Sequence, residues 1–291
     1  MSEAVLDPVP PLRTAAAAQW KAVGLAVRRE VLVAAVLLAA GQLYMGLVER
    51  ATGEAIPLGY LDEIGVLAGA AAFLFPFFVW KGENSFGFST LWTLPVGHAR
   101  HALLKVAAGW AWVMVLTAGF GALMLLPVLI TGGPLGEEFT RLVADPAAPS
   151  SFRPVEWSTP WWWWLLPFGA ASTTYLLGSA LVLATRRPWR WIVGTGLGLL
   201  LLRIGGVVGV DPMDGLFETL VSGVWLARYG VETLLNSGVQ SIEVWLHRPS
   251  GEEVKAWREL PSLARWAGTV LLWSAVGLAG LLAATWRRRE A

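Results

Sequence analysis

The sequence lacks cysteine and is poor in charged residues. Without cysteine the chain has no disulfide, no thiol nucleophile and no thiolate ligand for a metal. Charged residues make up 15% of the chain and hydrophobic residues 55%, whereas an ordinary soluble domain has about 25% charged residues. This balance indicates a protein that lies in a membrane.

Motifs for nucleotide, metal and acid–base chemistry are also missing. No G-x-x-x-x-G-K-[ST] sequence occurs, so the chain has no P-loop of its own. Its three histidines, His98, His101 and His247, form no H-E-x-x-H pattern, and we interpret them as surface residues. A membrane-embedded enzyme would need several ionisable residues within its spans. Because only Arg203 clearly lies within one, we expect no enzymatic activity, cofactor or metal in this chain.

The overall charge gives no reason to expect nucleic acid as a partner. The chain has 22 lysines and arginines against 21 aspartates and glutamates. At the N-terminus, acids and prolines stand where a signal peptide would have basic residues and an apolar core. We therefore expect no cleaved signal peptide.

Six apolar segments approach the roughly 20 residues that a helix needs to cross a bilayer. They predict an all-α integral membrane protein that forms a single transmembrane domain over residues 1–291. The expected spans are residues 31–48, 64–80, 103–130, 161–184, 191–210 and 266–286.

The charges alternate between the segments that connect these spans. Basic residues are retained on the cytoplasmic side of a membrane, which predicts that both termini lie in the cytoplasm and that the chain is in the cytoplasmic (inner) membrane of the cell. The basic clusters are Arg28 and Arg29; Lys81, Arg100 and Lys105; Arg186, Arg187 and Arg190; and Arg287, Arg288 and Arg289. The other side receives Glu49, Asp62, Glu63, Glu137, Glu138, Asp145 and Asp211.

Three further segments complete the expected architecture. Residues 11–30 mix apolar and basic residues, as in an amphipathic helix that lies in the cytoplasmic interface; a frayed, Ala-rich tail is the alternative. Residues 211–265 are too apolar for a solvated loop and too interrupted for a span, which favours short re-entrant helices. The run Trp161–Trp164 is typical of an interfacial aromatic belt, and an aromatic wall for an amphiphilic substrate is the alternative.

Polar residues within the spans are candidates for a substrate path. We name Tyr44, Thr173, Tyr175 and Arg203 as possible path residues. Hydroxyl groups in membrane helices also bond their own helix or a neighbour. Arg203 either reaches the interface and pairs with an acid, or contacts an anionic headgroup of the substrate.

The segment between the second and third spans carries its own pattern, "KGENSFGFSTLWTLPVGHARHALLK" over residues 81–105. An amphipathic stretch over residues 86–95 ends at Pro95, which cannot continue a helix interior. Arg100 and Lys105 then open the next span. The pattern predicts a short cytoplasmic helix held between two transmembrane helices.

This turn resembles that of the permease subunits of type-2 ABC transporters, in which a Leu-Pro-Val-Ser-Arg-like stretch ends in a lysine at the start of the third span. The matching residues here are Leu94, Pro95, Val96, Arg100 and Lys105. The six-span plan, the interfacial helix and the long outer segment add to the resemblance. Leu91 and Trp92 stand where the family often has an acid, and Glu83 is the nearest acid.

The resemblance implies that residues 86–95 form a coupling helix, which docks on a separate P-loop ATPase that holds ATP and Mg²⁺. The implied contact residues are Glu83, Phe86, Phe88, Leu91, Trp92, Leu94, Pro95, Val96 and Arg100. It further implies an exporter in which a second permease copy, or a sister permease, completes the translocation path among membrane lipids. The alternative is a membrane scaffold or assembly factor that transports nothing.

Overall fold

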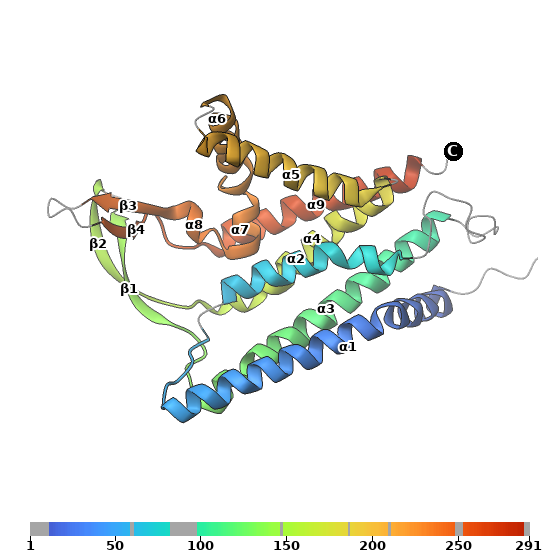
Figure 1. The fold of residues 1–291 in the computed structure, drawn as a ribbon, viewed down its shortest axis with the longest axis horizontal. Helices are drawn as coiled ribbons and strands as arrows, with labels where there is room; N and C mark the ends of the chain where they lie inside the picture. Colours follow the sequence, from blue (N-terminus) through green and yellow to red (C-terminus); the bar gives the residue numbers. More distant parts are fainter. Residues whose placement is uncertain are drawn as a thin grey trace, which may run out of the picture.

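The computed structural model describes residues 12–58, 61–81, 98–145, 148–185, 187–208, 211–247 and 253–287, and most of these residues are helical (Figure 1). Four helices in these ranges are long and apolar enough to cross a membrane. They are α1 (Leu12–Thr52), α3 (His98–Thr131), α4 (Leu166–Ala184) with the 3₁₀ turn η2 (Trp161–Leu165) that precedes it, and α9 (Leu263–Arg287). These four helices indicate a multi-pass membrane protein.

The two other expected spans form helices but do not belong to this group of four. The apolar part of α2 (Leu61–Val79) is confined to Ile64–Val79, a length of about 24 Å against the roughly 30 Å of a hydrocarbon core. Helix α5 (Pro188–Val207) contains Arg190 and Arg203. The count of six spans therefore stays a prediction.

Helix α1 joins the expected interfacial helix at 11–30 to the expected span at 31–48 without a break in secondary structure. The structure has one continuous helix of 41 residues over these ranges. No proline interrupts the sequence between Leu12 and Thr52, so nothing breaks the ladder of backbone hydrogen bonds. Val23 and Val27 belong to the same buried cluster as Val106 and Val113 of α3, which holds the first half of α1 against the bundle.

Helix α4 is the centre of the bundle. Along its apolar stretch 61% of the residues are buried, against 6% along the apolar stretch of α1. Helices α2 and α9 pack on its two sides. Small residues allow this close approach: a Cβ at Gly178 would strike the Phe73 carbonyl of α2, and one at Gly277 of α9 would lie 3.0 Å from Leu176 Cβ. Helix α4 is thereby fixed between two neighbours.

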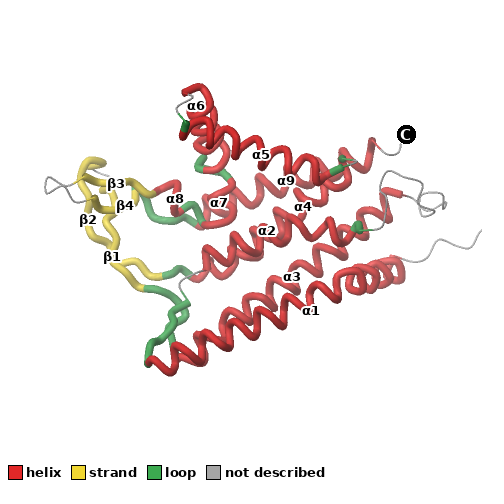
Figure 2. Tube along the Cα trace, viewed as in Figure 1, coloured by secondary structure: helices red, strands yellow, loops and turns green. Residues whose placement is uncertain are grey.

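A small mixed sheet corrects the expectation of an all-α protein. It consists of β1 (Glu138–Asp145), β2 (Ala148–Ser158), β3 (Glu243–His247) and β4 (Glu253–Trp257) in the order β2-β1-β4-β3. Strands β1 and β4 are parallel and pair Leu142 with Ala256, although about a hundred residues separate them in the chain. The sheet projects from one end of the helices (Figure 2).

Aromatic side chains join the sheet to the bundle. Trp157 of β2 lies 4.9 Å from Trp163 and 5.5 Å from Trp257 of β4, between ring centroids. Trp162 stacks on Trp266 of α9 at 5.8 Å. Trp162 and Trp163 are thus buried packing residues, which corrects the interpretation of the whole run as an interfacial belt; Trp161 is exposed.

Short helices occupy the segment between α5 and β3. They are α6 (Asp211–Leu220), the π turn η3 (Val221–Trp225), α7 (Val231–Asn236) and α8 (Val239–Ile242). Two residues with positive φ, Ser237 (55°) and Gly238 (82°), reverse the chain between α7 and α8. Short helices were expected over 211–265, whereas the β3–β4 hairpin in that range was not.

The two ends of the molecule differ in the segments they collect. The start of α1, the end of α2, the start of α3, the end of α4, the start of α5 and the end of α9 lie at one end (Figure 1). The sheet and α7 lie towards the other. The described helix ends that flank the basic clusters therefore share one end of the molecule, here called the basic end.

Candidate functional site

The predicted docking segment falls between α2 and α3. Residues 82–97 lie outside the described residues, and with them Glu83, Phe86, Phe88, Leu91, Trp92, Leu94, Pro95 and Val96. The structure describes both flanks of this segment, namely α2 with its last turn to Lys81, and α3 from His98 onwards. Arg100, the last of the predicted contact residues, is half-buried in the first turn of α3.

Contacts among α1, α2 and α3 hold these flanks in place. The Lys105 ammonium lies 4.6 Å from the ring centre of Trp80, and both side chains are buried. The His101 ring Nδ1 lies 3.3 Å from the Gln19 amide nitrogen of α1. Lys81 and Glu30 approach to 4.0 Å on the surface, a pair too exposed to add more than about 1 kcal/mol. The three helices therefore form a fixed base on either side of residues 82–97.

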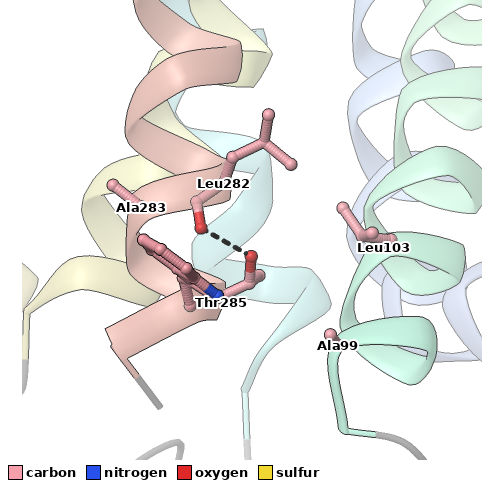
Figure 3. A pocket seen from close by; sticks show the side chains of 6 residues that line it. Ala99, Leu103, Leu282, Ala283 and Thr285 are labelled. Atoms are coloured by element: carbon pink, nitrogen blue, oxygen red, sulfur yellow. Dashed lines mark hydrogen bonds between the residues drawn. The ribbon is translucent and has the colours of Figure 1, made fainter. Parts of the chain in front are cut away.

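A cleft of about 290 Å³ opens beside this base, between the first turns of α3 and the last turns of α9 (Figure 3). Its wall is mostly apolar; the polar side-chain groups of its lining are the Trp286 indole N–H and the Thr285 hydroxyl, which donates to the Leu282 carbonyl at 2.9 Å. A surface of this kind suits hydrocarbon rather than a charged ligand. The lining residues are Ala99, Leu103, Leu282, Ala283, Thr285 and Trp286.

Two of the predicted path residues, Thr173 and Tyr175, are fully buried in α4. The Thr173 and Ser274 hydroxyls lie 2.9 Å apart and join α4 to α9. The Tyr175 hydroxyl donates to the Val106 carbonyl of α3 at 3.0 Å. In this single chain both side chains bond to neighbouring helices.

The other two predicted path residues lie on exposed surfaces. Tyr44 of α1 is 69% exposed. Arg203 of α5 is exposed and lies 5.5 Å from the ring centre of Phe217 of α6. Since α1 and α5 lie on opposite sides of the bundle (Figure 1), the four residues are not brought together within one chain.

A second polar group, which sequence reasoning missed, lies at the end opposite to the base. The Arg265 guanidinium of α9 donates to the Arg228 carbonyl at 2.8 Å, to Glu259 at 2.7 Å, and to the Ser241 hydroxyl. Glu232 of α7 is 1% exposed, and its carboxylate accepts the Gln240 backbone N–H at 3.0 Å. These bonds tie the turn from α7 to α8 onto the start of α9.

Burial raises the pKa of the Glu232 carboxyl, although the Gln240 N–H, Ser241 and Arg265 act in the opposite direction. The sequence held one signal for this group: Glu232 is an acid inside the apolar stretch Val231–Leu235. A buried acid needs hydrogen bonds or a cation. Arg265, about 30 residues away, could not be chosen from several arginines by sequence alone.

Helix α7 is also wedged against the bundle. A Cβ at Gly65 of α2 would strike the Leu235 carbonyl, and one at Gly69 would lie 2.6 Å from Leu235 Cδ2. The two glycines, four residues apart, form a flat strip on α2 against which α7 lies. The Thr174 hydroxyl donates to the Gly69 carbonyl at 2.7 Å, which adds α4 to the same contact.

Comparison of the chain with protein-family models, curated proteins and solved structures found no match.

Proposed function

We propose that this chain is the membrane permease subunit of an ATP-driven exporter of the ABC type. One observation carries the proposal: the Leu-Pro-Val sequence, which resembles that of a coupling helix, connects the two helices whose ends are fixed at the basic end of the molecule. A helix that receives force from a partner must be anchored on both sides. The contacts of Lys105 with Trp80 and of His101 with Gln19 supply such anchors.

In this proposal the basic end faces the cytoplasm and both termini lie there. The basic clusters lie next to helix ends that share one end of the molecule, which fits the retention of positive charge inside the cell. The chain resides in the cytoplasmic membrane with six spans, α2 and α5 included. ATP and Mg²⁺ bind to a separate ATPase, and a second permease copy or a sister permease completes the path. Residues 86–95 dock on the ATPase.

The packing of α2 supports a route from the docking segment to the opposite end. Helix α2 begins beside α7 and ends at the docking segment, and it packs on α4 along its length. A displacement at its inner end therefore reaches Leu235 through Gly65 and Gly69. ATP binding drives transport if it favours one of two positions of α2 and the α7 helix packed on it. Helices α6–α8 then act as the outer gate.

The test compares two matched substitutions at opposite ends of the molecule. Leu94→Asp places a charge in the proposed docking segment, and Leu135→Asp places the same charge on an exposed residue at the outer end. The tagged full-length chain is purified from its native cells in mild detergent, and co-purifying ATPase activity is measured. We expect this activity to fall at least tenfold in Leu94→Asp and to stay unchanged in Leu135→Asp.

Equal ATPase activity in both variants, with both proteins inserted, would overturn the docking assignment. If the wild-type preparation itself contained no ATPase, that result would favour the scaffold alternative.

A further inference from the structure

A second cleft, larger than the one between α3 and α9, lies where the first half of α1 meets α3. It has a volume of about 630 Å³. Its floor is a stacked pair of tryptophans: the rings of Trp20 and Trp112 are 4.5 Å apart at 17°, and the Trp112 indole N–H donates to the Trp20 carbonyl at 3.0 Å. Gly24 permits this contact, because a Cβ there would lie 2.7 Å from Trp112 Cζ2.

The cleft combines this apolar floor with two positive charges. Lys21 and Arg28 belong to its lining together with Leu25, Val31 and Leu32. The two cations are seven residues apart, which is two helical turns, so they lie on the same face of α1.

The cations of the cleft are not neutralised by the neighbouring acid. Within the part of the chain that the structure describes, Lys21 and Arg28 have no ion pair, and the only acid in the first half of α1, Glu30, faces Lys81 of α2. The helix has an excess of positive charge there, with Arg13, Lys21, Arg28 and Arg29 against Glu30. An occupant with negative charge and an apolar body would complement both parts of the cleft.

The position of the cleft indicates the source of such an occupant. It lies at the basic end of the molecule, in the first half of α1, and α1 is the least buried of the four helices that are long and apolar enough to cross a membrane. Leu25 and Leu32 are 62% and 53% exposed, on the surface that surrounding lipid would contact. Basic side chains at this depth attract anionic lipids.

We propose that this cleft binds an anionic phospholipid from the surrounding leaflet. Its phosphate accepts hydrogen bonds from Lys21 and Arg28, and one acyl chain lies along Leu25, Val31 and Leu32 towards the Trp20–Trp112 pair. The proposal requires that the protein lies in a membrane but not that it transports anything. It therefore stands or falls independently of the ATPase.

The test uses the full-length chain in mild detergent and measures bound phosphatidylglycerol by native mass spectrometry, with phosphatidylcholine as the neutral comparison. The variant Lys21→Gln/Arg28→Gln removes both cations of the cleft. The matched control, Arg13→Gln/Arg29→Gln, removes the same charge from exposed positions of the same helix that do not line the cleft.

We expect the wild type and the control to bind one phosphatidylglycerol in preference to phosphatidylcholine. The cleft variant should bind it roughly 30-fold more weakly, because each basic side chain near a lipid surface contributes about fivefold. Equal binding of the two lipids, or an equal loss in both variants, would overturn the proposal, since either would point to diffuse charge. A cleft variant that changes the mass of the oligomer without changing lipid binding would show a second copy of the chain in the cleft instead.

The absence of cysteine permits a second readout. Leu25→Cys, labelled with a small fluorophore, should be quenched by brominated phosphatidylglycerol more than by brominated phosphatidylcholine. Replacement of Lys21 and Arg28 should remove that difference. Equal quenching by both lipids in the labelled wild-type background would contradict the assignment.

Discussion

Replacement of Arg265 should release the short helices at the outer end of the molecule while the transmembrane bundle stays folded. Its side chain is 10% exposed and donates to four groups: the Arg228 carbonyl, the Ser241 hydroxyl, the Glu259 carboxylate and, at the longer distance of 3.4 Å, the Thr233 hydroxyl. Glutamine at this position keeps a polar side chain but loses the positive charge and the forked geometry.

The expected magnitude follows from these bonds. Glu259 is 52% exposed, so its ion pair with Arg265 contributes at most about 1 kcal/mol. The bonds to the Arg228 carbonyl and the Ser241 hydroxyl are charge-assisted, at about 1.5 kcal/mol each. Arg265→Gln should therefore lower the local stability of the α7–α8 turn by about 3 kcal/mol. Arg265→Lys, which can keep one bond, should lower it by about half as much.

Hydrogen–deuterium exchange measures this local stability. A loss of about 3 kcal/mol corresponds to roughly 150-fold faster exchange at the Gln240 amide, which is bonded to Glu232. Amides in the middle of α4 serve as the internal control and should keep their rates. Unchanged exchange between Val231 and Ile242 in Arg265→Gln would refute the account of how α9 holds this turn.

Two further predictions concern buried groups. Burial raises the pKa of Glu232, so the native state keeps a proton that the unfolded chain has lost. The local stability of the α7–α8 turn should therefore fall as the pH rises from about 4.3. Hydrogen–deuterium exchange at pH 4, 5.5 and 7 measures this fall, and Glu232→Gln should abolish it. An identical pH dependence in the variant would contradict it. The Cβ of Gly109→Ala would strike the Tyr175 hydroxyl, and the substitution should destabilise the protein by about 1–3 kcal/mol. Measured by thermal unfolding in micelles, Gly109→Ala should cost less stability when Tyr175→Phe is already present. Strictly additive losses of stability would argue against the contact.

The helices could be predicted from the sequence because their signals are local. The apolar runs at 103–130, 161–184 and 266–286 correspond to α3, to η2 with α4, and to α9. The length of an apolar run is set by the hydrocarbon thickness and does not depend on what the helix packs against.

The sheet could not be predicted in the same way, because its pairing joins distant segments. Leu142 of β1 lies opposite Ala256 of β4, far along the chain. The strands β1 and β2 also lack clean alternation, because Arg141 lies on the same face as Phe139 and Pro154 interrupts β2. Arg141 is accommodated because its guanidinium lies 4.9 Å from the Phe139 ring centre and 5.8 Å from that of Trp257. A charge stacked on two aromatic rings is not visible to a hydrophobic pattern.

The candidate site was partly predictable for a related reason. Lys105 and Arg100 were found as the residues that open a span, since positive charge marks that boundary. The contacts of Lys105 and His101 could not be foreseen, because their partners lie in other parts of the chain: Trp80 directly follows α2, and Gln19 belongs to α1.

The most direct test of the central proposal is to identify the partners of the wild-type chain in its native membrane. The tagged chain is crosslinked in cells, extracted in mild detergent, and the recovered proteins are quantified by mass spectrometry. The account predicts a P-loop ATPase recovered near one copy per chain, with crosslinks that include residues 82–97. Recovery of the intact chain without any such ATPase would contradict the assignment as an ABC permease.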